Sequence, residues 1–538
     1  MPENFQLKNN AENRTFYDHH HQFCQLKNRK MRKIFLLISV SLIIVTAALL
    51  ILHFTVNGKG DNQQMLDFSL GSKEDFYTDF NAFLEDDQMK HAALSFMVFD
   101  PESGKVLFEH NGDMALSPAS VIKVITTASA LEILGNDTFF YTKIGYQGRI
   151  DSARKKLIGN VVIKGGGDPC LGANMADKPV FISDWVKVIR TLGIDSITGD
   201  IIADDGVFDP DVVPDDWGFV DIPSYYGTAP FGLSVYNNRY TALISTAKKG
   251  VFHPGRDSVK PYMPLLTFET HISNNFDQAS YLDVHGSYYN WHRIIKGNLP
   301  KSEKNVEIEG SIPDPPFLLA SQLYEKLLQS GIKIGGNPVT VRILKSENVT
   351  CTDEFIPLGS LSSPRLGDIV KTTNMVSQNL YAEHLLIHCG IKQSGRGNTK
   401  SGAEAVLSFW NSKEIHLDGM VQTDGSGISR SNAISAAHLS HILTYMLVKS
   451  KNKDVFWKSL PVSGESGTLK HLGNETAIQG KIRAKSGSMT RIRGYAGYLE
   501  NRDGKTYVFA IIINNFTGKP TALREKIEKV FISIHNNL

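Results

Sequence analysis

The spacing of hydrophobic and polar positions changes several times after residue 72, and each spacing predicts an element. Residues 73–89 follow a helical period, with Ser72 as N-cap and Asp75 three positions later. ALSFMVFD (93–100) and KVLFEHN (105–111) alternate around the turn PESG and predict a β-hairpin. Residues 117–135, SPASVIKVITTASALEILG, are largely apolar and predict a buried helix that ends at Gly135.

The pattern of hydrophobic and polar positions in residues 136–345 differs from the pattern on either side. Residues 136–345 alternate short β-like runs such as KLIGNVVIKG and VTVRIL with turn-rich stretches such as GGGDP and IPDPP. Helical periods return after Gly359, followed by three strand-like runs from IQGKIRAKSG to KTYVFAIIINNF and a last helix over 520–535. We therefore expect an α+β domain (72–135 and 346–538) whose hairpin and final strands share one antiparallel sheet. Residues 136–345 would be one or two inserted, mostly β modules.

One segment shows no regular alternation of hydrophobic and polar positions. Residues 34–56 form 23 positions whose only titratable side chain is His53, long enough to span a hydrocarbon core of about 30 Å. Five basic residues precede it closely, and only Lys59 follows closely, so the positive-inside rule keeps residues 1–33 in the cytoplasm. We expect a single-pass membrane anchor (34–56), a linker at 57–71 and export of the rest of the chain. A cleaved signal peptide, and hence a secreted protein, is the alternative.

Composition narrows the class of protein. A formal net charge of +2 gives no reason to expect a nucleic-acid partner. Cys24, Cys170, Cys351 and Cys389 show no metal-binding spacing, and free thiols outside the membrane are expected rather than a disulfide. No metal or cofactor is predicted.

The buried helix contains a lysine where an apolar residue is expected. Lys123 lies among Val121, Ile122 and Val124, one turn after Ser120. Burying an ammonium costs several kcal/mol unless it is paired or loses its proton. A desolvated lysine has a lowered pKa and can take the proton of a nearby serine. The backbone N–H of a serine at a helix start can also serve as one oxyanion donor. S-x-x-K occurs five times in the chain, but only the copy at Ser120 has this apolar setting.

Two later motifs strengthen this interpretation. Ser377-Gln378-Asn379 offers a hydroxyl and a carboxamide at the start of another apolar helix. Lys485-Ser486-Gly487-Ser488 ends a strand, where a glycine would let a substrate backbone lie alongside. The N–H of Ser488 would be the second oxyanion donor. S-x-x-K, S-x-N and K-[ST]-G in this order are typical of penicillin-recognising serine acyl-transferases.

The layout closely resembles the D-Ala-D-Ala carboxypeptidase/endopeptidase family called class C, type-4 penicillin-binding proteins. The resemblance covers about 70–538 and includes IKGGGDPCL, SQNLYAEHLL, TDGSGISRSN and AKSGSMTRIRGYAGYL. It implies a transpeptidase-like catalytic domain formed by 72–135 and 346–538 and held on the outer side of a bacterial cytoplasmic membrane. It also implies peptidoglycan stem peptides as substrates and β-lactams as inhibitors.

The resemblance also implies roles for individual residues. Ser120 would be the acylated nucleophile, Lys123 the base, Ser377 the proton relay, Asn379 the holder of the substrate amide and Lys485 the group that tunes the site. The residues implied to bind substrate are Ser486, Gly487, Ser488, Arg430 and Met489.

The chain departs from the family pattern at two points, with Gln378 in place of Asp and K-S-G-S in place of K-T-G-T. Neither removes a catalytic atom, although side-chain specificity could shift. Two other functions stay open at this point. A β-lactamase would differ in how fast it hydrolyses the acyl-enzyme, and a scaffold would bind peptidoglycan through a decayed site. The 257 positions between Ser120 and Ser377 are too many for a compact β-lactamase. The sequence does not give the preference between carboxypeptidase and endopeptidase, the diamino acid or the oligomeric state.

Overall fold

The computed structural model describes residues 72–176, 178–211, 213–244, 258–275, 279–299, 306–349 and 354–538. None of the helices in these ranges is long and apolar enough to cross a membrane. The predicted tail, anchor and linker (1–71) lie outside the described residues, as do Cys24 and Cys351. Cys170 and Cys389 are free thiols, as expected.

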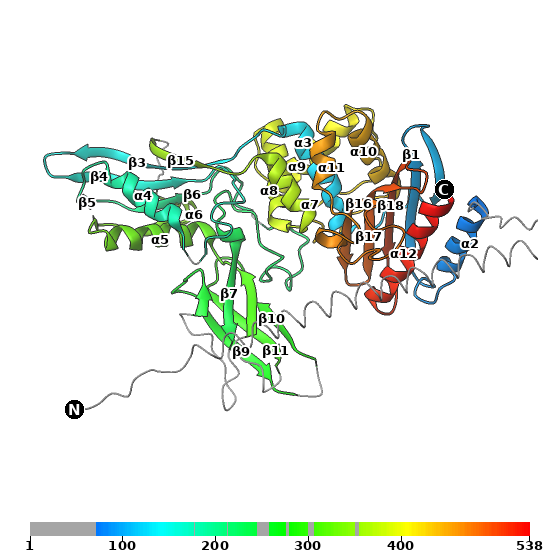
Figure 1. The fold of residues 1–538 in the computed structure, drawn as a ribbon. Helices are drawn as coiled ribbons and strands as arrows, with labels where there is room; N and C mark the ends of the chain where they lie inside the picture. The colour runs from blue at the N-terminus through cyan, green and yellow to red at the C-terminus, as the bar shows by residue number, and fades with distance from the viewer. Residues whose placement is uncertain are drawn as a thin grey trace, which may run out of the picture. The chain divides into compact units, whose positions relative to one another are not determined.

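A five-stranded antiparallel sheet joins the two ends of the described chain, in the order β16-β17-β18-β1-β2 (Figure 1). Its strands are β1 (Ala93–Asp100), β2 (Lys105–His110), β16 (Ile482–Met489), β17 (Ile492–Glu500) and β18 (Thr506–Asn514). β1 lies beside β18, with Met97 opposite Ala510. The predicted pairing of the N-terminal hairpin with the C-terminal strands is confirmed.

Alternate residues of this sheet enter two different cores, because side chains on a strand point to opposite faces in turn. Met97 and Ile512 pack on one face, against the helices α3 (Lys123–Leu134), α7 (Leu366–Met375), α8 (Asn379–Ser394), α9 (Thr399–Asn411), α10 (Ala436–Val448) and α11 (Lys453–Ser459). Phe96 and Ile511 pack on the other face, against α2 (Lys73–Leu84) and α12 (Pro520–Asn537). α3 is therefore enclosed, and Lys123 to Leu131 are all buried.

Two predicted helix bounds need correction. α2 has the expected Ser72–Asp75 capping box but ends at Leu84 rather than near Met89. Asp86 accepts from the Gln88 backbone N–H at 2.9 Å, and such local aspartate bonds favour a turn over a helix. Ser120 lies in a separate 3-10 turn, η1 (Ala119–Ile122), and the α-helix begins only at Lys123.

The inserted region combines its strands with helices that the sequence pattern does not predict. It contains the amphipathic helices α4 (Val180–Arg190) and α5 (Pro315–Gln329) and the short α6 (Val341–Ser346). VTVRIL, expected to be a strand, is divided between β14 (Pro338–Thr340) and α6, because Thr340 Oγ1 caps the helix by accepting from the Ile343 N–H at 3.2 Å.

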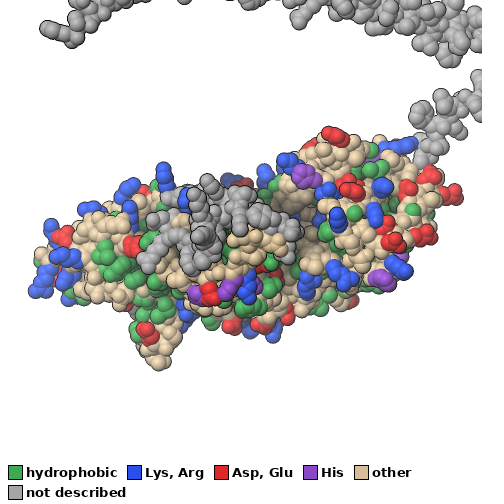
Figure 2. All heavy atoms as spheres, turned by 90° about the horizontal axis from the view of Figure 1, so that it is seen from below, with side chains coloured by type: hydrophobic (Ala, Val, Ile, Leu, Met, Phe, Trp, Pro, Cys, Tyr) green, Lys and Arg blue, Asp and Glu red, His purple; other side chains and the backbone are tan. Residues whose placement is uncertain are grey.

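The strands of the inserted region form three sheets, and α4 and α5 lie against the largest of them (Figure 1). The large sheet has seven strands: β3 (Tyr141–Asp151), β4 (Lys156–Lys164), β5 (Ser196–Ile197), β6 (Ile201–Asp204), β13 (Lys333–Ile334), β14 and β15 (Ile356–Ser362). The smaller sheets are β8-β7-β12 (β7 Arg239–Ile244, β8 Val259–Lys260, β12 Val306–Ser311) and β10-β11-β9 (β9 Thr267–Ser273, β10 Tyr281–His285, β11 His292–Asn298). β15 pairs with β3, so the large sheet continues past the predicted boundary at residue 345. Figure 2 shows acidic and basic side chains interspersed over the face it displays.

Candidate active site

Ser120 and Lys123 meet at the junction between η1 and α3. Lys123 Nζ lies 2.9 Å from Ser120 Oγ, and the lysine side chain is completely buried while Ser120 is partly exposed. A 3-10 turn running into an α-helix places residues three apart on one face, which brings the two side chains together. The S-x-x-K pair predicted from the apolar helix is therefore assembled as expected.

Lys123 makes two further contacts that fix its amine. Nζ lies 2.7 Å from Asn379 Oδ1 and 2.5 Å from the backbone carbonyl of Ser426. Burial lowers the pKa of Lys123 to about 7, although the nearby carboxylates of Asp424 and Glu383 act in the opposite direction. A substantial fraction of this amine is neutral at neutral pH, and a neutral amine can accept the hydroxyl proton of Ser120.

Two buried carboxylates hold the loop that supplies the Ser426 carbonyl. Glu383, on α8, accepts from the backbone N–H groups of Gly425 at 2.9 Å and Ser426 at 2.8 Å. Asp424 accepts from the N–H groups of Gly427 and Ser429, both at 2.7 Å. Burial raises the pKa of Glu383, and the charge of Asp424 adds to the effect. These bonds orient the loop so that its carbonyl faces Lys123.

A second buried lysine faces Ser377. Lys485 Nζ, from β16, lies 3.0 Å from Ser377 Oγ and 2.6 Å from the Ser486 carbonyl. Burial lowers its pKa well below the usual value, and the positive charges of Lys123 and Arg493 lower it further. Ser377 has a φ of 58°, a conformation uncommon for a residue with a side chain. The S-x-N and K-S-G motifs therefore meet, as predicted.

β16 forms an edge of the five-stranded sheet and lies against η1. A Cβ added to Gly487 would stand 2.6 Å from the Pro118 carbonyl and 2.8 Å from a Val121 methyl group, so only glycine permits this close approach. Backbone bonds from residues 461–463 cover the beginning of β16, and the last of them joins Ala484 N to Pro461 O at 3.1 Å. The K-S-G-S segment follows beyond that covered stretch.

The remaining predicted substrate residues lie along this edge. Ser486 Oγ donates to Thr468 Oγ1 at 2.7 Å, and Ser488 is exposed. Arg430 is exposed, and its guanidinium reaches the Thr490 carbonyl at 3.5 Å, next to partly buried Met489. Arg430 therefore lies beside the end of β16.

The inserted region supplies side chains and backbone to the site. Asn379 Nδ2 donates to the Tyr226 carbonyl at 2.8 Å, and Trp217 Nε1 donates to Asp424 at 3.0 Å. Gln378, which replaces the family's usual Asp, accepts from Arg239 Nη2 at 2.8 Å. The insertion thus forms one wall of the site and ties the second motif to it.

Sequence reasoning missed Glu383 and Asp424 as parts of the site. The signal for Glu383 was present, since it is an acid in the apolar helix NLYAEHLL, the same anomaly that revealed Lys123. The chain contains two K-S-G triplets, and the structure shows which of them belongs to the site. The copy at 400–402 lies inside α9, whereas Lys485–Gly487 faces the serines.

A serine in contact with a buried, low-pKa lysine, beside a second serine–lysine pair, defines a serine acyl-transferring hydrolase. The model of the D-Ala-D-Ala carboxypeptidase 3 (S13) family matches residues 77–533, and the chain belongs to that family. The family predicted from the three motifs is thereby confirmed.

Two relatives illustrate the likeness. A D-alanyl-D-alanine carboxypeptidase from an Actinomadura species is 26% identical over 488 residues, covering 87% of this chain and 86% of that protein. The crystal structure of penicillin binding protein 4 from Haemophilus influenzae aligns with a TM-score of 0.70 at 21% identity, covering 83% of this chain and 96% of the other. The latter likeness shows that the two proteins share a fold.

Proposed function

We propose that the protein hydrolyses the D-Ala-D-Ala bond of peptidoglycan stem peptides, or D-alanyl cross-links between them, through an acyl-enzyme on Ser120. The observation that carries this proposal is the 2.9 Å contact between Ser120 Oγ and the buried, low-pKa amine of Lys123. Membership of the family supplies the substrate class.

In the first half-reaction Lys123 removes the proton of Ser120, and Oγ attacks the carbonyl carbon of the penultimate D-Ala. The N–H groups of Ser120 and Ser488 stabilise the developing oxyanion. As the C–N bond breaks, Ser377, in contact with Lys485, passes its proton to the leaving amine. The proton that Lys123 removed from Ser120 then restores the Ser377 hydroxyl, so Lys123 is neutral again once the acyl-enzyme has formed. D-Ala, or the amine of a cross-linked peptide, leaves, and an ester to Ser120 remains.

In the second half-reaction water attacks the ester, Lys123 accepts its proton, and the C–Oγ bond breaks. Ser120 Oγ regains a proton, and the shortened peptide leaves as a carboxylate.

Asn379 holds the substrate amide, while Ser486 and Ser488 bind the terminal carboxylate on the edge of β16. Arg430 and Met489 border the substrate side chain.

β-Lactams would acylate Ser120 in the same way. A solved structure of the Haemophilus influenzae protein is a complex with a β-lactam. Both Glu383 oxygens already accept backbone N–H groups. This carboxylate is therefore poorly placed to activate a water molecule for fast deacylation, and a β-lactamase activity is not favoured.

The apolar segment 34–56 supports a location on the outer side of a bacterial membrane, with residues 1–33 inside. All five proposed catalytic residues are present, namely Ser120, Lys123, Ser377, Asn379 and Lys485. Their presence argues against a peptidoglycan-binding scaffold whose catalytic site has decayed.

The experiment is a turnover assay with a soluble pentapeptide ending in D-Ala-D-Ala, in which released D-Ala is measured. The wild type is expected to release one D-Ala per peptide and Ser120→Ala none. Equal release by both proteins would contradict the proposal.

A further inference from the structure

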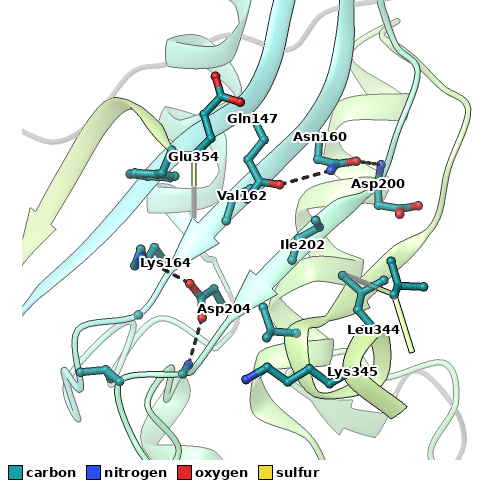
Figure 3. Close-up of a pocket in the computed structure, with 16 residues that line it drawn as sticks. Gln147, Asn160, Val162, Lys164, Asp200, Ile202, Asp204, Leu344, Lys345 and Glu354 are labelled. Carbon is teal, nitrogen blue, oxygen red and sulfur yellow. Dashed lines mark hydrogen bonds and ion pairs between the residues drawn. The ribbon is translucent and has the colours of Figure 1, made fainter. Parts of the chain in front are cut away.

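A cavity of about 520 Å³ lies in the inserted region, between β3, β4, β6 and α6. None of the residues that line it belongs to the acyl-transfer site. Its volume falls in the range of cavities that hold small molecules or one or two units of a polymer, roughly 300–1,000 Å³. We call this cavity the rim pocket, because polar side chains border its apolar floor (Figure 3).

The rim pocket has an apolar floor between two polar sides (Figure 3). Val162, Ile202 and Leu344 form the floor, and all three are buried. Gln147, Asn160 and Asp200 line one side, and Lys164, Asp204 and Lys345 line the other, while Glu354 lies near Gln147.

Hydrogen bonds hold the first polar side in place. Asn160 Nδ2 donates to Gln147 Oε1 at 3.2 Å, and Asn160 Oδ1 accepts from the Asp200 N–H at 2.8 Å. Asp200 Oδ1 accepts from the Asn337 N–H at 2.8 Å. Side chains fixed in this way lose little entropy when a ligand binds.

The second polar side combines both charges. Lys164 Nζ and Asp204 Oδ2 are 3.7 Å apart, and Asp204 Oδ1 accepts from the Gly206 N–H at 3.0 Å. Lys345 adds an exposed ammonium from α6. The pocket therefore presents both donors and acceptors around its floor.

This chemistry selects among ligand classes. A strongly anionic ligand would meet the carboxylates of Asp200, Asp204 and Glu354, and a cationic ligand would meet Lys164 and Lys345. A wholly apolar ligand would desolvate these groups without compensation. A neutral ring with one C–H face and a periphery of hydroxyl and amide groups satisfies both the floor and the polar sides, and a pyranose sugar has this form.

We propose that the rim pocket binds an uncharged, N-acetylated sugar unit of the glycan backbone to which the substrate peptides are attached. This inference rests on the proposed function, because the chain then acts on peptides carried by a glycan polymer. A sugar site on the same chain raises the effective concentration of neighbouring peptides at Ser120.

The first test is binding of a probe without peptide. Chitotetraose, a tetramer of β-1,4-linked N-acetylglucosamine, is titrated into the protein by calorimetry. Val341→Trp places an indole in the pocket from the first residue of α6, and Leu328→Trp makes a comparable change at an exposed position on α5. Saturable binding to the wild type and Leu328→Trp, with its loss in Val341→Trp, is expected. No saturable binding to the wild type, or equal binding by all three proteins, would overturn the proposal.

The second test compares two substrates in the same proteins. Val341→Trp is expected to lower D-Ala release from polymeric peptidoglycan by about tenfold and to leave release from the soluble pentapeptide unchanged. Lys345→Glu, an exposed charge reversal at the rim, serves as a second variant if the indole impairs folding. Equal losses on both substrates, or on neither, would contradict the sugar site. Failure of the wild type on the pentapeptide would instead refute the proposed function.

Discussion

The acyl-transfer site and the rim pocket use similar side chains in opposite ways. Lys123 is fully buried, close to Glu383 and Asp424, and its pKa falls to about 7. Lys164, at the rim pocket, is half exposed and pairs with Asp204 at 3.7 Å. Water solvates the second lysine, so its charge costs little, whereas the first is kept in a costly environment by the surrounding fold. A buried lysine can therefore act as a base, whereas an exposed lysine can contribute to ligand binding as a cation.

The most severe change to the buried side of this comparison is Lys123→Met, which keeps the length and apolar stem of the side chain but removes the amine. Without a base for Ser120, and with Glu383 and Asp424 left uncompensated, acylation is expected to fall by about 10³-fold or more. Stopped-flow measurement of β-lactam acylation gives the rate. A variant that folds and still acylates within tenfold of the wild type would contradict the assignment of the base.

Glu383→Gln tests the carboxylate that holds the loop beside Lys123. The amide has only one oxygen, so the N–H of Gly425 or Ser426 loses its acceptor, and a loss of about tenfold to a hundredfold in acylation is expected.

The variant is also expected to change the pH dependence. Acylation requires neutral Lys123, so the wild-type rate should rise with pH through about 7 and level off above it. The charges facing this amine are those of Glu383, Asp424 and Lys485. The two N–H donors and the charge of Lys123 favour the ionised form of Glu383, and that charge raises the pKa of Lys123. Its removal should therefore shift the rising limb to lower pH. Glu132→Gln, a carboxylate on α3 bonded to Ser450 and Asn452, is the matched control and should leave the limb in place. A limb unmoved in both variants would assign Glu383 a purely structural role.

Trp217→Phe tests the tie between the insertion and the site. It removes the donor at 3.0 Å from Asp424 and leaves a buried carboxylate oxygen short of one partner, which should cost about 1–3 kcal/mol of stability. Urea unfolding followed by circular dichroism measures the loss. Trp291→Phe, at a tryptophan of the insertion that packs on Phe317, is the control for removing an indole nitrogen. An equal loss in both variants would remove Asp424 from the explanation.

Lys164→Met completes the comparison on the exposed side. Exposed ion pairs contribute little because water and salt screen them, so the free energy of unfolding should change by less than about 1 kcal/mol. The same urea series measures this change. A loss as large as that of a buried network would show that the rim pocket is a structural ion-pair site rather than an open one.

The sequence predicted the catalytic domain better than the insertion, for a physical reason. The five-stranded sheet, its covering helices and the three motifs follow from local periodicity and from one anomaly, a lysine in an apolar helix. In the insertion, the helical spacing of Phe181, Ile182, Trp185 and Ile189 in α4 is short and is surrounded by strand and turn signals. The β-branched residues of VTVRIL favour a strand, but the side chain of Thr340 caps a helix there.

Other parts depend on long-range contacts that no local pattern contains. The bonds from Glu383 to Gly425 and Ser426 join residues 42 and 43 positions apart, and Gln378 meets Arg239 across 139 positions. The position of Glu383 in an apolar helix marked it as unusual, but its partners could be found only from the fold. The pairing of β15 with β3 beyond residue 345 is of the same kind.

The most direct test of the central claim is the intact mass of the protein after exposure to excess benzylpenicillin. One penicilloyl adduct is expected, located by peptide mapping to the peptide that carries Ser120 and absent from Ser120→Ala. An adduct on another serine, or a folded protein that neither forms an adduct nor consumes penicillin, would contradict the assignment of Ser120 as the nucleophile.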